Sequence, residues 1–273
     1  MPVLSERLPR VLSIAGSDSG GGAGIQADLK AFARCGVHGM TAITAITAQN
    51  TVAVTAVHPV PGELIVEQVR AVVEDIGVDA VKIGMLGAVA TIEAVGEALD
   101  LVGDAPIVLD PVMISETGAR LLEEDAQEAL RTQLLPRAAV VTPNLPEAAV
   151  LAERAQDTDP AELVRAVHAL GPGVAVLTGG HREEATDIFF DGERLVEIPG
   201  ERYEGGSAHG SGCTHSSALA AHLALGFEPL EAARRAKQIA SAAVRDGLST
   251  VGHGPGPVDV FGLEANRLGS RRP

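Results

Sequence analysis

The chain has 273 residues and a formal net charge of −15, and this acidity argues against a broad nucleic-acid surface or an anionic membrane as its partner. Hydrophobic residues make up 46% of the chain but aromatic residues only 2%, so the core must be built from Ala, Val, Leu and Ile. That composition suits buried parallel strands under alanine-rich helices, in one large α/β domain that spans residues 1–273. Two widely separated cysteines and the lack of a long uncharged apolar segment favour a reduced, cytoplasmic protein.

Strand and helix patterns alternate along the chain. Short apolar or β-branched runs predict strands over residues 10–15, 40–47, 52–57, 80–83, 107–110, 139–142 and 174–177. Apolar residues at helical spacing predict helices over residues 25–35, 64–76, 89–101, 123–132 and 145–170, the last of them broken near 157–160. Residues 187–190 and 194–198 predict a β-hairpin at an antiparallel edge, and the polar tail from about 264 is expected to be loose. The alternation implies a mostly parallel sheet with helices on both faces, in which ligands bind beyond the carboxyl ends of the strands.

The stretch 208–214 contains two glycines around a serine and then becomes helical. The first amides of such a helix lack intrahelical acceptors, and with the helix dipole they favour an anion beside Gly210, Ser211 and Gly212. Cys213 would stand at this positive end, which is expected to lower the pKa of its thiol. The stretch therefore predicts a phosphate cradle beside a reactive or proton-accepting group, although an ordinary glycine-rich turn before a packing helix explains it equally well when taken alone.

Two carboxylates, Asp110 and Glu147, follow predicted strands. Asp110 would also suit a turn, and Asn144 with Glu147 would also suit a helix cap, so neither is specific by itself. A few oxygen ligands, completed by water and phosphates, are what Mg²⁺ prefers. Together with an anion-binding helix start, the two carboxylates predict phosphoryl transfer, which needs a metal, amides for the developing charge and a base for the attacking hydroxyl.

Six short segments occur along the chain in an order that is more specific than any one of them. They are 15–30 (AGSDSGGGAGIQADLK), 47–51 (TAQNT), 82–86 (KIGML), 109–113 (LDPVM), 142–148 (TPNLPEA) and 209–214 (HGSGCT). Through these segments the chain resembles the hydroxymethylpyrimidine/phosphomethylpyrimidine kinases of thiamine biosynthesis, members of the ribokinase superfamily, from about residue 11 to 259. The resemblance implies a ribokinase-like three-layer α/β sandwich. It also implies an enzyme that uses ATP and Mg²⁺ to phosphorylate 4-amino-5-hydroxymethyl-2-methylpyrimidine and then the resulting monophosphate.

The same resemblance implies roles for individual residues. The pyrimidine pocket would be lined by Gly16, Ala23, Gln49, Met85, Val112 and Cys213. Mg²⁺ would be held by Asp110 and Glu147, and the nucleotide would lie near Asn144, Glu147, Thr178, Gly180 and Lys237. Gln49 offers both a donor and an acceptor to an aminopyrimidine edge. Cys213 would be the catalytic base at the position where related sugar kinases carry an aspartate, or else a small buried residue.

The sequence allows two interpretations for each of three further residues. Asp28 is a further polar candidate for the pyrimidine pocket, or a charge on a helix surface. Lys237 matches a family lysine near the nucleotide, but a cation on an exposed basic face with Arg234 and Arg235 is the preferred interpretation. His215 stands where an apolar residue is common, either on a helix face without a role, which is preferred, or as an extra group near the phosphates.

Thr178 departs from the family pattern, which often has Lys-Gly-Gly-His where this chain has Thr-Gly-Gly-His. The missing ammonium would remove a phosphate contact and puts the handling of the nucleotide or of the second phosphorylation in doubt. Two other functions remain open, a pyridoxal kinase of the same superfamily and a non-catalytic nucleotide- or vitamin-binding regulator. Asp110, Glu147 and the 210–213 loop argue against the regulator. The expected partners are ATP and a small pyrimidine, and the sequence is compatible with a homodimer.

Overall fold

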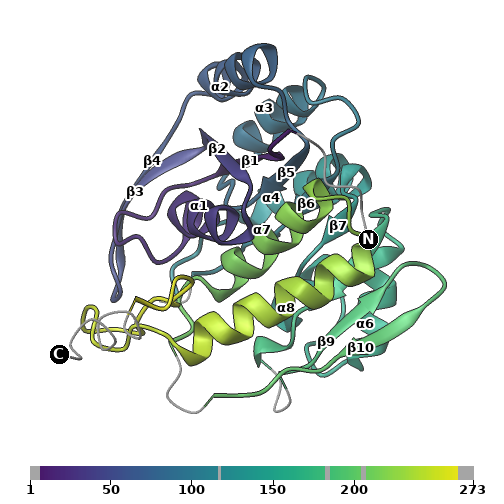
Figure 1. The fold of residues 1–273 in the computed structure, drawn as a ribbon. Coiled ribbons are helices and arrows are strands. Elements are labelled where there is room, and N and C mark those ends of the chain that lie inside the picture. Colours follow the sequence, from purple (N-terminus) through teal and green to yellow (C-terminus); the bar gives the residue numbers. More distant parts are fainter. Residues whose placement is uncertain (1–6, 116–117, 182–184, 204–206, 264–273) are drawn as a thin grey trace.

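The computed structural model describes residues 7–115, 118–181, 185–203 and 207–263 (Figure 1). Within these residues the main sheet has eight strands in the order β10-β9-β8-β7-β6-β5-β1-β2. They are β1 (Arg10–Ala15), β2 (His38–Ile43), β5 (Ala80–Ile83), β6 (Ile107–Leu109), β7 (Val140–Val141), β8 (Val174–Leu177), β9 (Asp187–Phe190) and β10 (Leu195–Ile198). Neighbours from β8 to β2 pair in parallel, whereas β9 is antiparallel to both β8 and β10. The predicted parallel sheet and its antiparallel edge hairpin are therefore confirmed.

Helices cover both faces of this sheet. They are α1 (Gly24–Cys35), α2 (Gly62–Asp75), α3 (Val89–Leu99), α4 (Glu124–Ala129), α5 (Leu145–Leu151), α6 (Pro160–His168), α7 (Ser211–Ala224) and α8 (Pro229–Arg245). Apolar side chains of α2 to α6 pack on one face, and those of α1, α7 and α8 pack on the other, which is the near face in Figure 1. The sheet thus lies between two helical layers, each with its own apolar core.

The pleat of the strands decides which side chains meet which layer. In β5, Val81 and Ile83 belong to the core under α2 and α3, whereas Ala80 belongs to the core under α1 and α7. Lys82 has the same parity as Ala80, and its register partner in β1 is Ser13. Both polar residues are fully buried. A serine and a lysine are therefore placed beneath α1 and α7, where an apolar layer would otherwise continue.

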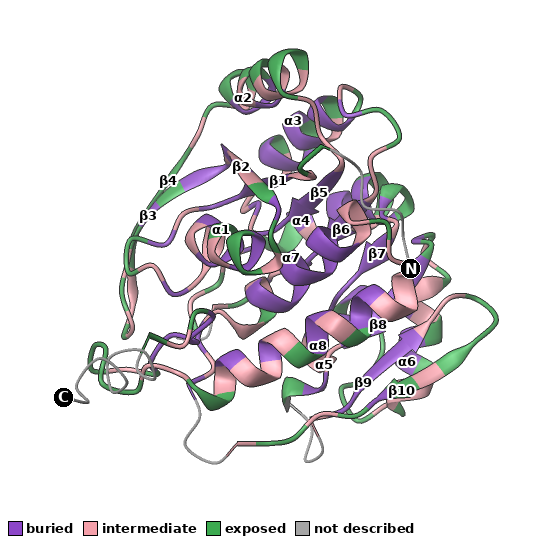
Figure 2. Cartoon of the chain, viewed as in Figure 1, coloured by how far each residue is buried: buried purple, intermediate pink, exposed green. Residues whose placement is uncertain are grey.

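Helix α7 is made largely of small residues and is buried along most of its length (Figure 2). Four consecutive residues, Ala218–Ala221, have no exposed surface. Because their side chains are short or well packed, the helix axis can approach the sheet closely. This close approach brings the start of α7 over the carboxyl ends of the central strands.

The expected strand over residues 40–47 is in fact two strands. β3 (Ala45–Gln49) leaves the sheet and pairs with β4 (Val54–Pro59) in a separate antiparallel ribbon. Thr44 lies at the break, where its amide donates to the Ala15 carbonyl and its hydroxyl donates to the Met85 carbonyl. These tertiary bonds replace the ladder bonds of a longer strand, and the break carries Gln49 to the pocket described below.

Two predicted helices also differ from expectation. The region 145–170 contains α5 and α6, separated by a longer interruption over 152–159 that replaces the narrow break near 157–160. The helix over 123–132 ends as α4 at Ala129 and continues as a π-helical turn over Leu130–Leu134. Within the described part of the chain, no helix is both long and apolar enough to cross a membrane. The tail from about 264 lies outside the described residues.

Candidate active site

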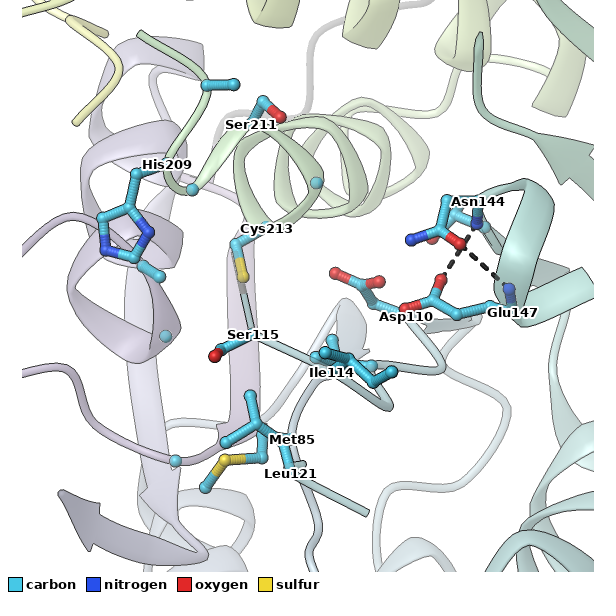
Figure 3. A pocket seen from close by; sticks show the side chains of 18 of the residues that line it. Met85, Asp110, Ile114, Ser115, Leu121, Asn144, Glu147, His209, Ser211 and Cys213 are labelled. Atoms are coloured by element: carbon cyan, nitrogen blue, oxygen red, sulfur yellow. Dashed lines mark hydrogen bonds between the residues drawn. The ribbon is translucent and has the colours of Figure 1, made fainter. Parts of the chain in front are cut away.

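Most of the predicted site residues line one pocket at the carboxyl ends of the parallel strands (Figure 3). The predicted residues found there are Gly16, Ala23, Gln49, Met85, Asp110, Val112, Asn144, Glu147, Thr178, Gly180, Gly210, Ser211, Gly212 and Cys213. One end of the pocket is apolar, with Met85 and Leu121, and the other carries the polar side chains of Asn144 and Glu147 (Figure 3). Cys213 lies between these two ends, at the start of α7.

Gly210 brings two glycine-rich loops into contact where α7 begins. Its φ of 85° lies in the left-handed region, and a Cβ there would overlap the carbonyl oxygen of Gly22 in the loop between β1 and α1. The next amides, of Gly212 and Cys213, lie in the first helical turn and have no acceptor within the helix. A Cβ on Gly212 would meet open space. This helix start therefore suits an anion in the pocket.

Asp18 and His209 join the same two loops through their side chains. Asp18 Oδ2 and His209 Nε2 lie 3.0 Å apart, and both residues are buried. Asp18 also accepts hydrogen bonds from the amides of Gly20, Gly22 and Ala23. Burial alone would raise the pKa of Asp18, but the contact with His209 and these amides lowers the pKa below its ordinary value. Sequence analysis missed this pair, although an aspartate that starts a glycine-rich loop is typical of a side chain that caps its own loop.

Cys213 does not have the low thiol pKa expected of it. Its side chain is half-buried and points to the middle of the pocket (Figure 3). Burial, with the carboxylates of Asp28 and Asp110, raises the pKa of the thiol to about 12, although the ammonium of Lys82 opposes this shift. The predicted direction was therefore wrong, because the loss of water and two neighbouring carboxylates outweigh the positive end of the helix.

Asn144 and Glu147 form the helix cap that their spacing suggests. Asn144 Oδ1 accepts from the Glu147 amide and Glu147 Oε2 accepts from the Asn144 amide, each at 2.9 Å. Both residues also line the pocket, so the capping interpretation and a functional one are compatible. Burial and, after it, the carboxylate of Asp110 together raise the pKa of Glu147 to about 8. Asp110 is itself buried and accepts a hydrogen bond from Ser216 Oγ at 2.9 Å.

These two carboxylates fit a divalent cation that arrives with phosphate. Asp110 and Glu147 repel each other in a buried setting, and a cation between them would relieve that repulsion. No three His, Cys, Asp or Glu side chains in the described part of the chain converge into a protein-only metal cage. Mg²⁺ does not need such a cage, because one or two carboxylates suffice when water and phosphates complete its shell.

Asp28 is one of two predicted site residues outside the pocket lining. It is fully buried beneath the pocket and accepts hydrogen bonds from Ser13 Oγ, Lys82 Nζ and Ser217 Oγ. Neither sequence interpretation was right, since the residue does not line the pocket and does not lie on a helix surface. The reason is that the inner face of α1 packs directly on the sheet and against α7.

Lys237 is the second predicted site residue outside the pocket lining. It is buried and not part of an exposed basic face. Its Nζ donates to Asp187 Oδ1 at 2.6 Å, and His215 Nε2 lies 3.1 Å from Asp187 Oδ2. Asp187 Oδ1 also accepts from the Gly179 amide at 2.8 Å. We call Asp187, His215 and Lys237 the edge cluster; it supports the turn after β8 and does not line the pocket. The interpretation preferred for Lys237 was thus wrong, because α8 turns its side chain inward. His215 lies on α7 outside the pocket lining, so it is not an extra group of the pocket, and it contacts Asp187 instead of solvent.

Several lining residues were not singled out from the sequence. They are Ser17, Gly24, Lys82, Ile114, Ser115, Leu121, Thr142, Ala208 and His209. Lys82 carried a signal, because a lysine inside a short apolar strand is seldom buried without a partner. Ile114, Ser115 and Leu121 lie in an irregular connection after β6, where no periodic pattern could have pointed to them.

The fold and the pocket define a class of α/β proteins that hold a phosphate-bearing ligand beside a small organic one, at the carboxyl ends of parallel strands. The chain belongs to the phosphomethylpyrimidine kinase family, whose model matches residues 18–259. It is 50% identical to the hydroxymethylpyrimidine/phosphomethylpyrimidine kinase of Rhizobium meliloti, over 92% of this chain and 96% of that protein. The protein of the same name from Streptomyces coelicolor is 46% identical, over 92% of this chain and 94% of its own.

Solved structures agree with this assignment at the level of the fold. An ADP complex of Bacillus subtilis pyridoxal kinase is 37% identical and superposes with a TM-score of 0.86, covering 94% of this chain and 99% of that one. A phosphomethylpyrimidine kinase from Clostridium difficile is 42% identical and superposes with a TM-score of 0.74, covering 84% of this chain and 96% of that one. The expected ribokinase-like architecture is thereby confirmed.

Proposed function

We propose that this protein transfers the γ-phosphoryl group of ATP to 4-amino-5-hydroxymethyl-2-methylpyrimidine, and then phosphorylates the monophosphate to the diphosphate for thiamine biosynthesis. The observation that carries the proposal is a single pocket whose apolar end adjoins an anion-binding helix start and two carboxylates. Relatives at 50% and 46% identity, named as kinases of both acceptors, support the substrate class. The need for ATP favours the cytoplasm as the location.

Residues at the apolar end would orient the pyrimidine. The Gln49 amide can donate to and accept from the aminopyrimidine edge. Met85 and Val112 would provide apolar walls for the ring. A Cβ at Gly16 would displace the end of the Met85 side chain, and Ala23 keeps the neighbouring wall small.

Residues at the polar end would bind the phosphates. At the end of the 210–212 loop, the amides of Gly212 and Cys213 would stabilise charge that develops on the transferring phosphoryl group. Asp110 and Glu147 would hold Mg²⁺, which when bound neutralises phosphate charge. Thr178 and Gly180 would contact the nucleotide, with a neutral hydroxyl where the family often has an ammonium.

Cys213 would accept the proton of the hydroxymethyl group in the first reaction. As the hydroxymethyl oxygen bonds to the γ-phosphorus, the bond from that phosphorus to the bridging oxygen of ADP breaks and ADP leaves. Burial raises the pKa of the Cys213 thiol, and the ammonium of Lys82 opposes that shift, which favours the thiolate that would act as this base. In the second reaction the acceptor is an anionic phosphate, which needs no base.

A coupled assay of ADP release tests the proposal. Purified protein is given ATP and Mg²⁺ with the pyrimidine, with its monophosphate or with pyridoxal, and each reaction is repeated with a chelator. We expect release with the first two acceptors and none without Mg²⁺. Release with pyridoxal but not with the pyrimidine would contradict the proposal. No release with any acceptor, in a protein that still binds ATP by calorimetry, would favour the regulator.

Pyridoxal kinase activity is a second candidate, favoured by one observation. Structures of pyridoxal kinases from two organisms match this chain with TM-scores of 0.86, one of them in complex with pyridoxal. Pyridoxal also carries a hydroxymethyl group on a nitrogen heterocycle but lacks the amino group that Gln49 would bind. We therefore expect Gln49→Leu to lower kcat/KM for the pyrimidine more than for pyridoxal, and equal losses would remove Gln49 from this role.

A further inference from the structure

Lys82 is a buried cation at the floor of the pocket. The residue has no exposed surface, and its Nζ donates to Asp28 Oδ1 at 2.9 Å and lies 3.9 Å from Asp110 Oδ2. Lys82 and Asp110 belong to the pocket lining, whereas Asp28 lies beneath it. The ammonium is therefore held between a carboxylate that anchors it and a carboxylate of the site.

One face of helix α7 carries polar side chains that contact the two carboxylates beside Lys82. Cys213, Ser216 and Ser217 are spaced i, i+3 and i+4 and share one face of the helix. Ser216 Oγ donates to Asp110 Oδ2 at 2.9 Å, and Ser217 Oγ donates to Asp28 Oδ1 at 2.7 Å. One helix face thus binds both carboxylates that flank the ammonium and carries the cysteine at its pocket end.

Lys82 differs from the other described pocket residues in its positive charge. Of the lining residues that the structure describes, Lys82 is the one Lys or Arg. Thr178 is neutral where the family often has lysine, and Lys237 is paired outside the lining. The carboxylates of Asp28 and Asp110, 2.9 and 3.9 Å from its Nζ, favour the charged ammonium.

We infer that Lys82 is a positioning residue for phosphoryl transfer: anchored by Asp28, its ammonium orients the Asp110 carboxylate and stabilises the negative charge that forms at Cys213. The inference rests on the proposed function. A charge that is already in place in a water-poor setting acts without reorganisation when the acceptor hydroxyl loses its proton. Because the ammonium has no exposed surface, it works through its neighbours and not by touching the acceptor.

A purely structural role makes a different prediction. In that case Lys82 only neutralises the buried Asp28, and removing both charges together would leave the reaction intact. The double variant Lys82→Gln/Asp28→Asn removes both charges of this pair and keeps amide groups for the hydrogen bonds of the two serines. Asp110 loses its cation but keeps its hydrogen bond from Ser216 Oγ. Arg34→Gln, which removes an exposed cation from the last turn of α1, is the matched control.

Steady-state kinetics of the first phosphorylation decide between these roles. For the double variant we expect a thermal midpoint close to that of the wild type, KM values for ATP and the pyrimidine within a few-fold, and kcat lower by roughly 10²-fold. Arg34→Gln should match the wild type. A folded double variant with wild-type kcat would overturn the inference.

A single variant keeps the test decisive if the double variant does not fold. Asp28→Asn retains the ammonium but weakens its anchor, so we expect kcat to fall by about ten-fold with KM unchanged. Lys82→Arg, which keeps the positive charge, should retain more activity than the neutral double variant. An unchanged kcat in Asp28→Asn would count against Lys82 as an anchored positioning group.

Alkylation of Cys213 separates this inference from the proposed function. In a Cys35→Ala background, iodoacetamide should modify Cys213 about ten-fold more slowly in the double variant than with Lys82 present, because the cation stabilises the reacting thiolate. This measurement needs no substrate. If the wild type phosphorylates neither acceptor, the proposed function fails while the alkylation rates still test Lys82; equal rates would refute its role at Cys213.

Discussion

Lys82 and Lys237 are both buried lysines paired with buried aspartates, but the pairs stand in different surroundings. In the pair of Lys82 and Asp28, 2.9 Å apart, Lys82 lines the floor of the pocket and Asp28 lies beneath it. The pair of Lys237 and Asp187, 2.6 Å apart, lies outside the lining, where Asp187 also accepts the Gly179 amide. One cation therefore lies at the floor of the pocket, and the other pairs with a carboxylate that binds a backbone turn.

This contrast shows why burial and pairing do not by themselves indicate a functional group. A buried ion pair beside reacting atoms can lower the energy of a transition state, whereas the same pair against a turn contributes to the native state alone. We therefore expect substitutions at the pocket floor to change kcat more than stability. Substitutions in the edge cluster should change stability more than kcat.

The largest expected effect is at Cys213. If the thiol accepts the proton, Cys213→Ser should lose roughly 10²–10⁴-fold in kcat for the pyrimidine, because a serine hydroxyl is far harder to ionise. KM for the pyrimidine should change little, and Cys213→Asp should recover part of the rate. Initial-rate kinetics with each variant measure this. A serine variant that turns over like the wild type would make Cys213 a pocket wall only.

In the edge cluster we expect a substitution to change stability and not kcat. Lys237→Met leaves Asp187 buried without its ammonium, so we expect a loss of about 3–5 kcal/mol in the free energy of unfolding. For molecules that remain folded, kcat should stay within a few-fold of the wild type. Urea unfolding and initial rates are the two measurements. Arg234→Met, an exposed cation on the same helix, should change stability by less than about 0.5 kcal/mol. A large fall in kcat at unchanged stability would contradict the contrast.

Glu147 tests whether one residue can serve both the fold and the site. Glu147→Gln preserves the capping geometry, so its stability should be close to that of the wild type, while the loss of negative charge should lower kcat by about 10²-fold. Glu147→Ala removes the cap as well and should lose about 1 kcal/mol of stability in addition. Titration of kcat against Mg²⁺ and thermal unfolding separate the two effects. Unchanged kcat at saturating Mg²⁺ would leave Glu147 as a helix cap.

The smallest expected effect is a pH dependence of the stability that the edge cluster contributes. Burial alone would raise the pKa of Asp187, but His215 and Lys237 lower the pKa below its ordinary value. The resulting stabilisation is present above the unfolded pKa of about 3.9 and is lost as the pH falls through the lower folded value. The stability gap between wild type and Lys237→Met should therefore be larger near neutral pH and narrower by about 1 kcal/mol or more at pH 3. Urea unfolding across this range measures the gap, and a gap that stays constant to pH 3 would refute this linkage.

Much of the fold could be predicted because its strands are local patterns. β1, β5 and β8 begin and end at the predicted residues, since each is a short apolar run between polar or glycine-rich segments. The break at Thr44 could not be predicted, because it depends on hydrogen bonds to Ala15 and Met85. The positions of the pocket residues could be predicted because parallel strands bring their carboxyl ends to one edge of the sheet.

The sequence by itself determined which residues gather at the carboxyl edge of the sheet and where the helix with the anion-binding start begins. The tertiary structure alone decided the partners of the buried charges, since Lys82 lies 54 residues from Asp28 in the chain and Lys237 lies 50 residues from Asp187. It also decided the direction of the Cys213 pKa shift. The physical reason is that desolvation and charge pairing depend on which helix covers which strand, and residue type and spacing along the chain do not contain that information.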